Sequence, residues 1–367
     1  MTARAAGLPG LHLALEADGD GAHPAARLHS GRPAGAALTP AALRDTALAA
    51  EAAGLTLVTY ADTPLPPRAG GRTLGRIEAG TRAAYLSGLT DRIGLAPTLH
   101  VTTTEPFHLA TQLASLDHAS RGRAAWVVGA AADAAGLATV GRESVTPEEL
   151  AREIADVVDT ARALWDSWED DAIVRDVATG RFLDADRVHH IDFEGAAFSV
   201  KGPLITPRPP QGQVVVLAPD ALDADARADV VLVARDTVPA VAARAATARR
   251  NGAPLAFAEV EVVLDAATPA AERLAALDAD AERPDTGRLR HVGSSRELVR
   301  LLVELAGSVD GVRLHPAVLA VDLPVLAAEV LPALAAAGLH RPPVPGATLR
   351  ASLGLPRPAN RHAAARG

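Results

Sequence analysis

Residues 92–131, RIGLAPTLHVTTTEPFHLATQLASLDHASRGRAAWVVGAA, decide the fold. The apolar run at residues 93–101 predicts a buried strand, and EPFHLATQLASLDHASRG then predicts a helix that stops at Gly122. RAAWVVGAA predicts the next strand. Two strands joined through a helix form a crossover unit, which requires the strands to be parallel.

The same alternation continues on both sides of this stretch. Strands are predicted at residues 11–17 and 55–60 before it, and four more follow, from VVVLAP at residue 214 to GVRLHPAVL at residue 311. Helices are predicted between them, for example at residues 41–54, 147–168 and 240–251. About eight strands, most of them followed by a helix, favour a closed (β/α)8 TIM barrel in the α/β class over an open doubly wound sheet. No GxGxxG turn follows the first strand, which weakens the dinucleotide-binding alternative.

The alternation breaks once, after the fourth helix. Residues 169–212 are rich in turns and short polar–apolar alternation, which predicts an insertion of about forty residues. The Pro- and Arg-rich segment from His340 predicts a C-terminal tail that packs over a barrel helix or a second subunit. We therefore expect a single barrel domain over residues 1–367, with 169–212 as an insertion region.

The composition excludes several classes of chemistry. Lys and Arg number 36 against 44 Asp and Glu, so the net charge of −8 provides no general attraction for nucleic acid. Aromatic residues are 3% of the chain, which argues against base stacking. Lys201 is the only lysine, and the absence of cysteine excludes disulfides, thiolate catalysis and Cys-type metal clusters.

The N-terminal stretch has no basic region followed by a long apolar run, and no run reaches the 18 uninterrupted apolar residues of a membrane span. We therefore expect a cytoplasmic protein that binds neither membrane nor nucleic acid.

Barrel enzymes carry their sites at the carboxyl ends of the strands, so the search for functional residues is confined to those positions. Strand one ends in Glu16 and Asp18 with His23 in its loop, strand two ends at Asp62, and strand eight carries Arg313 and His315. Strand three carries Thr98, His100 and Thr102 at period two, so the three side chains share one face.

Each of these residues also has a structural interpretation. Asp62 is equally consistent with a turn cap, Thr98 with ordinary strand packing, and a lone buried histidine such as His100 is more often a satisfied core group. The pair His189-His190 resembles a chelate, but adjacent strand residues point to opposite faces, so we expect no metal site.

Three segments resemble the bacterial luciferase-like monooxygenases. They are residues 90–126, the insertion LWDSWEDDAIVRDVATGRFLDADRVHHIDFEGAAFSVKGPLITPRPPQGQ, and the end, VLPALAAAGL followed by TLRASLGLPRPANRHAAAR. The resemblance is to the branch with nitrilotriacetate, dibenzothiophene-sulfone and long-chain alkane monooxygenases, and it spans essentially the whole chain.

This resemblance implies a (β/α)8 barrel that binds reduced FMN, supplied by a separate flavin reductase, and uses O2 to oxygenate a small organic substrate. It places Asp62 and Thr98 as cofactor-binding residues, and it implies a homodimer or tetramer. We further interpret His100 and His23 as catalytic candidates, with His100 on the Thr98 face one step closer to the barrel mouth. Some relatives in the wider superfamily use the deazaflavin F420 instead.

The chain departs from that group where polar residues normally contact the flavin. After strand five the group's Ala-Gly-x-Ser phosphate loop is replaced by Leu-Ala-Pro-Asp-Ala. Pro219 lacks an amide hydrogen, and the Asp220 carboxylate would repel a phosphate. The replaced contacts fall at Val127, Pro147, Ala151, Pro219 and Ala221.

Two hypotheses remain. The first is a flavin-dependent monooxygenase that binds reduced FMN transiently; the second is a flavin-free barrel acting as a binding protein or silent subunit. An F420-dependent oxidoreductase is a further alternative.

Overall fold

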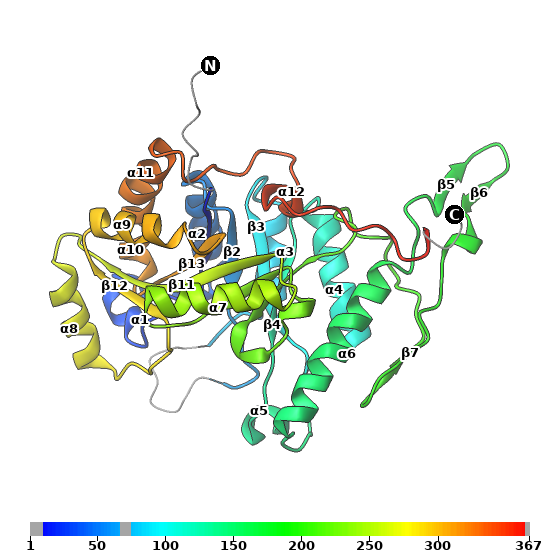
Figure 1. Cartoon of the computed structure of the whole chain (residues 1–367), viewed down its shortest axis with the longest axis horizontal. Coiled ribbons are helices and arrows are strands. Elements are labelled where there is room, and N and C mark those ends of the chain that lie inside the picture. The colour runs from blue at the N-terminus through cyan, green and yellow to red at the C-terminus, as the bar shows by residue number, and fades with distance from the viewer. Residues whose placement is uncertain (1–9, 67–74, 364–367) are drawn as a thin grey trace.

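Eight parallel strands close into a barrel in the computed structural model, which describes residues 10–66 and 75–363 (Figure 1). Closure is completed where the first barrel strand pairs with the last, through Leu13 opposite Val312. The predicted (β/α)8 barrel is confirmed. The barrel strands are β1 (His12–Glu16), β2 (Leu57–Tyr60), β3 (Gly94–His100), β4 (Ala125–Gly129), β9 (Val215–Pro219), β10 (Val230–Val233), β11 (Leu255–Leu264) and β13 (Gly311–Pro316).

Helices cover the outside of the barrel, and their ends follow local sequence signals. The helix α6 begins with a capping box, in which the Thr146 side chain accepts from the Glu149 amide and the Glu149 side chain accepts from the Thr146 amide. The strand-to-strand helices are α2 (Pro40–Ala52), α3 (Ala79–Ser87), α4 (Pro106–Ala119), α6 (Pro147–Trp165), α7 (Val238–Arg250), α8 (Ala270–Asp280) and α9 (Ser295–Leu305). Shorter helices are α1 (Ala26–His29), α5 (Ala134–Ala138) and the 3-10 turn η1 (Ala36–Leu38).

After β9 the expected helix is reduced to two 3-10 turns, η3 (Asp220–Leu222) and η4 (Asp225–Arg227). A ninth parallel strand, β12 (Leu289–Gly293), was not predicted from the sequence. It pairs with the second half of β11. At 10 residues β11 is the longest barrel strand: its first half pairs with β10, and its second half, beyond the end of β10, pairs with β12.

The last barrel helix is long and apolar enough to cross a membrane by length and composition. It runs from Leu319 to Ala336 as α10 (Leu319–Val325), the π turn η5 (Leu326–Val330) and α11 (Leu331–Ala336). Leu326, Val330 and Leu334 are fully buried against the barrel, so the apolar face serves as a core contact. The π turn directly follows Pro324, which cannot donate a backbone hydrogen bond within the helix.

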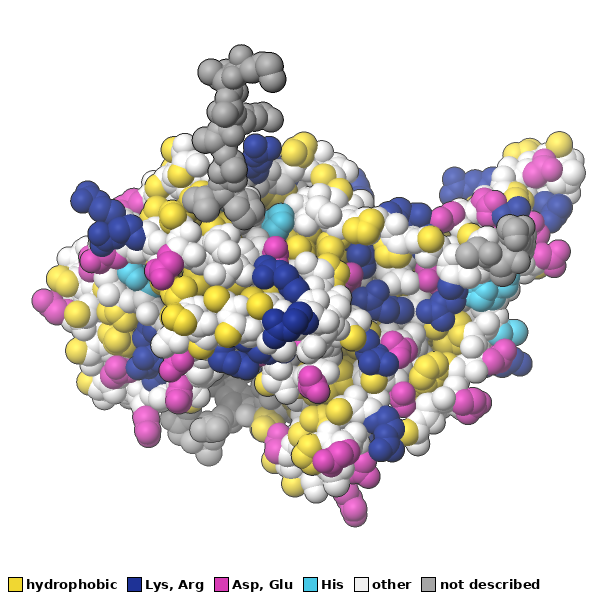
Figure 2. All heavy atoms as spheres, in the orientation of Figure 1, with side chains coloured by type: hydrophobic (Ala, Val, Ile, Leu, Met, Phe, Trp, Pro, Cys, Tyr) yellow, Lys and Arg dark blue, Asp and Glu magenta, His cyan; other side chains and the backbone are white. Residues whose placement is uncertain are grey.

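The insertion lies outside the barrel as two antiparallel hairpins. β5 (Ile173–Asp176) pairs with β6 (Arg181–Leu183), and β7 (Phe193–Glu194) pairs with β8 (Ser199–Val200), with the 3-10 turn η2 (Ala185–Arg187) between the two pairs. Figure 1 shows the β5–β6 hairpin projecting away from the barrel beyond α6. In Figure 2 acidic and basic side chains are interspersed over the visible face of the molecule.

The expectation that the tail packs over a barrel helix is wrong. Leu349 and Leu353, from the short helix α12 (Leu349–Ser352) and its end, belong to the apolar cluster inside the barrel. Arg350 donates to the carbonyl of Gln213 and pairs with Asp229, both of which lie just before barrel strands. The tail therefore plugs the amino end of the barrel, opposite the carboxyl ends of the strands.

Beyond the plug, the tail fastens the insertion to the barrel. Arg357 pairs with Asp170, and the Asn360 side chain donates to the carbonyls of Asp166 and Trp168.

The plug makes a testable contribution to stability. Leu353→Ala should lower the free energy of unfolding by about 2–3 kcal/mol, because it removes buried methyl groups and leaves a cavity inside the barrel. Urea denaturation measures the effect, and Leu48→Ala on exposed α2 is the matched control with little expected change. An unchanged midpoint for Leu353→Ala would show that the plug is not part of the cooperatively folded unit.

Candidate active site

A cavity of about 540 Å³ opens at the carboxyl ends of the barrel strands. This volume is in the range of small-molecule sites. Its wall includes charged residues from β1 and β13 and polar residues from β3, and the β9 end closes one side. Residues central to the wall are Glu16, Asp62, Thr98, His100, Pro219 and Arg313.

A buried ion-pair network forms one wall. Arg313 on β13 donates through Nε to Glu259 Oε1 of β11 at 2.5 Å, and its Nη1 lies 3.3 Å from Glu16 Oε2 of β1. Glu16 also accepts from the Thr59 hydroxyl at 2.8 Å and from the Ala61 amide at 2.8 Å. Because each buried charge has an opposite charge and hydrogen bonds, the network is rigid and part of its desolvation is compensated.

The network sets the protonation of its members. Burial alone would raise the pKa of Glu259, but Arg313, the His315 hydrogen bond and Arg288 hold that pKa well below its usual range. Burial lowers the pKa of His315 to about 4, despite the nearby Glu259 carboxylate. Burial raises the pKa of Glu16, partly offset by Arg313. At neutral pH, His315 is therefore a neutral ring beside an ionised Glu259.

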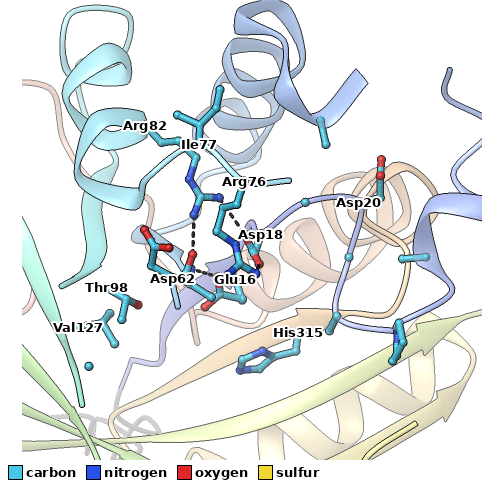
Figure 3. Close-up of a pocket in the computed structure, with 18 of the residues that line it drawn as sticks. Glu16, Asp18, Asp20, Asp62, Arg76, Ile77, Arg82, Thr98, Val127 and His315 are labelled. Carbon is cyan, nitrogen blue, oxygen red and sulfur yellow. Dashed lines mark hydrogen bonds and ion pairs between the residues drawn. The ribbon is translucent and has the colours of Figure 1, made fainter. Parts of the chain in front are cut away.

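A second ion cluster lies at the end of β1 (Figure 3). Arg76 and Arg82 converge on Asp18, each at 2.8 Å, and Arg82 also donates to the Ala61 carbonyl. The Arg82 guanidinium lies 5.3 Å from the centre of the buried Tyr60 ring. These contacts tie the start of α3 to the cavity wall.

Thr98 and His100 lie together on the cavity wall, as their period-two spacing predicted. Thr98 is paired with Val127 of β4 in the sheet register, and His100 with Gly129. A Cβ atom at Gly129 would lie 2.9 Å from Thr98 Cγ2 and 3.0 Å from the His100 ring. Glycine at the end of β4 thus leaves the space that these two side chains occupy. Thr102, further along, instead accepts from the Ala131 amide and is buried.

The protonation pattern of His100 follows from its partner. Nε2 lies 3.1 Å from the Asp62 carbonyl, which only accepts, so Nε2 carries the hydrogen and donates. Nδ1 is then an acceptor, and this buried atom has no hydrogen-bond partner among the residues that the structure describes. An unsatisfied buried acceptor is costly unless a ligand supplies a donor.

Two other candidates have structural partners. The Asp62 carboxylate accepts from the amides of Ala79 and Thr63 at 2.6 and 2.8 Å, which is the turn-capping interpretation. His23 lines the cavity, but Nδ1 accepts from the Ala25 amide and Nε2 lies 3.1 Å from Asp278. Both residues stay predicted site residues, though the contacts favour positioning roles.

Only some of the positions at which this chain lacks the polar flavin contacts of the resembling monooxygenases lie at the cavity. Val127 and Pro219 line it, whereas Pro147 and Ala151 are exposed at the start of α6 and lie outside its wall. Asp220 is not the uncompensated charge that the sequence suggested, because its carboxylate pairs with Arg235 at 2.6 Å and Arg244 at 3.3 Å.

Sequence reasoning overlooked Glu259 and Arg288, which pair at 3.2 Å at the cavity. The signal was present in LAFAEVEVVL, where two acids interrupt an otherwise apolar strand at period two. The two rings of His189 and His190 have different partners: His189 pairs with Glu169 at 2.8 Å, and His190 Nδ1 contacts the Gly202 carbonyl at 2.7 Å. Within residues 10–66 and 75–363 no group of three potential ligands is arranged to hold a metal.

Comparison with known proteins identifies relatives over different shares of the chain. N-acetyl-S-(2-succino)cysteine monooxygenase of Bacillus subtilis (strain 168) is 36% identical over 54% of this chain, but only 46% of that protein is covered. Nitrilotriacetate monooxygenase component A of Aminobacter aminovorans is 36% identical over 44% of this chain and 37% of that protein. A subunit of the pristinamycin IIA synthase of Streptomyces pristinaespiralis is 35% identical over 90% of this chain and 94% of that protein. The matches therefore span less than half of the first two relatives and nearly all of the third.

Comparison with solved structures identifies the same group of monooxygenases by fold. EDTA monooxygenase from Chelativorans sp. BNC1 superimposes with a TM-score of 0.78 over 95% of this chain and 99% of that chain, at 21% identity. The predicted branch is confirmed, since nitrilotriacetate, dibenzothiophene-sulfone and long-chain alkane monooxygenases are all among the relatives. The sequence model described as luciferase-like monooxygenase matches residues 21–300, and the chain therefore belongs to the luciferase-like monooxygenase family.

Proposed function

We propose that the chain is the oxygenase component of a flavin-dependent monooxygenase, which takes reduced FMN from a separate reductase and uses O2 to oxygenate a small organic substrate. The observation that carries this proposal is the cavity at the carboxyl ends of the strands, where Thr98 and His100 share one wall in a chain of this family. When bound, reduced flavin supplies the electrons that activate O2. The protein binds, orients and shields the reactants.

The fit to FMN differs between the two ends of the cofactor. The ring end fits, because the cavity offers apolar wall at Val127 together with the hydrogen-bonding groups of Thr98 and His100. The phosphate end does not fit at the end of β9, where Pro219 has no amide hydrogen and Asp220 presents a carboxylate. We therefore expect weak binding of oxidised FMN and a colourless purified protein.

His100 is the residue we assign to proton transfer. Asp62 fixes its tautomer through the carbonyl oxygen, so Nδ1 is the acceptor atom, and taking a proton from the substrate requires this buried atom to become accessible from the cavity. His23 is the weaker candidate, since both its ring nitrogens are engaged. We assign Asp62 a positioning role: it lies at the edge of the flavin ring, and its carbonyl oxygen holds the His100 ring in place.

Thr98 is expected to hold the flavin ring. Thr98→Val should weaken flavin binding by about 1 kcal/mol, the size of one hydrogen bond, or roughly fivefold in dissociation constant. Fluorescence titration measures it. Thr102→Val is the matched control. The Thr102 hydroxyl accepts a hydrogen bond from the Ala131 amide, so its loss should affect stability and leave flavin affinity unaltered. Equal affinities for wild type and Thr98→Val would remove Thr98 from the flavin site.

The proposed partners follow from the relatives. The designation "component A" of the nitrilotriacetate enzyme supports a separate reductase component, and the pristinamycin IIA relative, being one subunit of a synthase, supports assembly with further polypeptides. A homodimer or tetramer, cytoplasmic location and the choice of FMN over F420 stay predictions. Light scattering of the purified chain tests the first of these.

The function itself is tested by flavin reoxidation. Mixing the protein and reduced FMN with O2 in a stopped-flow instrument should give a reoxidation time course different from that of free reduced FMN. The cavity-filling variant Ala130→Trp should restore the free-flavin time course. Identical traces with and without wild-type protein would contradict the proposal.

A further inference from the structure

The Asp220 carboxylate occupies a pocket formed by two arginines at the carboxyl end of β9. Its side chain is 3% exposed, and Oδ2 lies 2.6 Å from Arg235 Nη1 and 3.3 Å from Arg244 Nε, ion-pair distances at which neither contact has the geometry of a hydrogen bond. The Ala234 amide, at the end of β10, lies 3.5 Å from the other carboxylate oxygen. A carboxylate thus has the surroundings of a bound anion: two guanidinium groups and a backbone donor.

The position adjoins the cavity. Pro219 and Leu222, on either side of Asp220 in the chain, both line the cavity wall. The turn η3 is only 3 residues long, so it has no row of free amides that would hold a phosphate by itself. The two arginines are therefore the means by which this corner would bind an anion, and Asp220 already engages both.

The other cations at the cavity are engaged as well. Arg76 and Arg82 pair with Asp18, and Arg288 and Arg313 pair with Glu259. Arg27 also has an interaction partner, so among the described residues every arginine in the cavity wall is already paired. A phosphate entering this cavity would have to compete with a carboxylate at Arg76, Arg82, Arg288 and Arg313.

We propose that Asp220 is a built-in anion that takes the place of a ligand phosphate, so that the cavity recognises a flavin by its ring alone and accepts riboflavin as well as FMN. This inference rests on the proposed function, because it concerns how the same cavity selects its flavin. Asp220 is then a specificity-determining residue, and removing its charge converts the corner into a phosphate site.

The experiment compares two flavins and three proteins. Dissociation constants for reduced FMN and reduced riboflavin are measured anaerobically with wild type, Asp220→Asn and Asp223→Asn. The second variant is the matched control: Asp223 is exposed, lies three residues on, and its loss changes the net charge equally; its φ of 51° is one that Asn tolerates. Asp220→Asn is expected to fold, since Arg244 keeps its two bonds to Asp225 and Arg235 is 41% exposed.

Wild type and Asp223→Asn should bind the two flavins within about threefold of each other. Asp220→Asn should bind FMN about tenfold or more tightly than riboflavin, the effect of charge-assisted hydrogen bonds to a phosphate. A wild-type preference of tenfold for FMN would overturn the inference, and so would an Asp220→Asn protein that still fails to distinguish the flavins.

A second measurement separates this inference from the proposed function. Inorganic phosphate should raise the Tm of Asp220→Asn with increasing concentration and leave wild type and Asp223→Asn unchanged. If none of the proteins binds either flavin, the proposed function fails, and the phosphate titration still decides the role of Asp220. A variant whose Tm does not respond to phosphate contradicts that role.

Discussion

Replacing Arg313 with methionine should lower the free energy of unfolding by about 3–5 kcal/mol, because it takes from buried Glu16 its arginine and from buried Glu259 one of two. Glu259 is 5% exposed and its pKa is held well below the usual range chiefly by Arg313, acting against burial. Without that guanidinium, Glu259 keeps only Arg288 as a cationic partner and must either stay charged in a poorly solvated site or take up a proton. Both outcomes cost stability, which chemical denaturation at neutral pH measures.

Two comparisons make this result specific to the buried pair. The double variant Arg313→Met with Glu259→Gln should recover part of the loss, because Glu259 no longer carries a charge while Glu16 still lacks its arginine. Arg44→Met, which breaks the exposed pair with Asp45, should change stability by no more than about 0.5 kcal/mol. A loss below about 1 kcal/mol for Arg313→Met would show that Glu259 does not depend on Arg313 for its charge.

Removing the His100 side chain should have the largest effect on activity. His100→Ala should lower turnover by about 10²–10⁴-fold, the range for loss of a positioned proton acceptor. Flavin affinity should change far less, because the flavin ring also contacts the neighbouring part of the cavity wall. Turnover is measured in the reductase-coupled reaction, and the control His108→Ala, on exposed α4, should retain full activity.

Added imidazole distinguishes a proton acceptor from a structural group. If Nδ1 accepts the proton, imidazole entering the space left in His100→Ala should restore part of the turnover without changing the Tm. An alanine variant with full turnover would exclude the catalytic role. A variant that is inactive, unstable and insensitive to imidazole would indicate that His100 only supports the wall through its bond to the Asp62 carbonyl.

The barrel was predictable because its signals are local. Each barrel strand lies in an apolar run, most of the long helices begin with a capping or proline signal, as at Thr146 and Pro147, and alternation of the two leaves few topologies. The same logic placed Thr98 and His100 on one face, because period two is a property of the strand itself.

The features that could not be predicted depend on contacts between segments that are distant in the sequence. The leucines of α12 lie in a Pro- and Arg-rich segment, and nothing in their spacing tells which end of the barrel they enter. The environment of Asp220 depends on Arg235 and Arg244, from the end of β10 and from α7, so the sequence alone showed a repelling carboxylate where the structure has a paired one. Glu259 was missed for the same reason, since its partner Arg313 is on another strand.

We propose that the cavity at the carboxyl ends of the strands binds a flavin ring against the wall that Thr98 and His100 form. The most direct measurement is a structure of the protein determined with saturating reduced flavin. We predict the ring inside the cavity above β3 and β4, with Thr98 and His100 Nδ1 within hydrogen-bonding distance of the ring or of the substrate space beside it. A flavin bound elsewhere on the molecule, or an unchanged cavity at saturating flavin, would contradict the account.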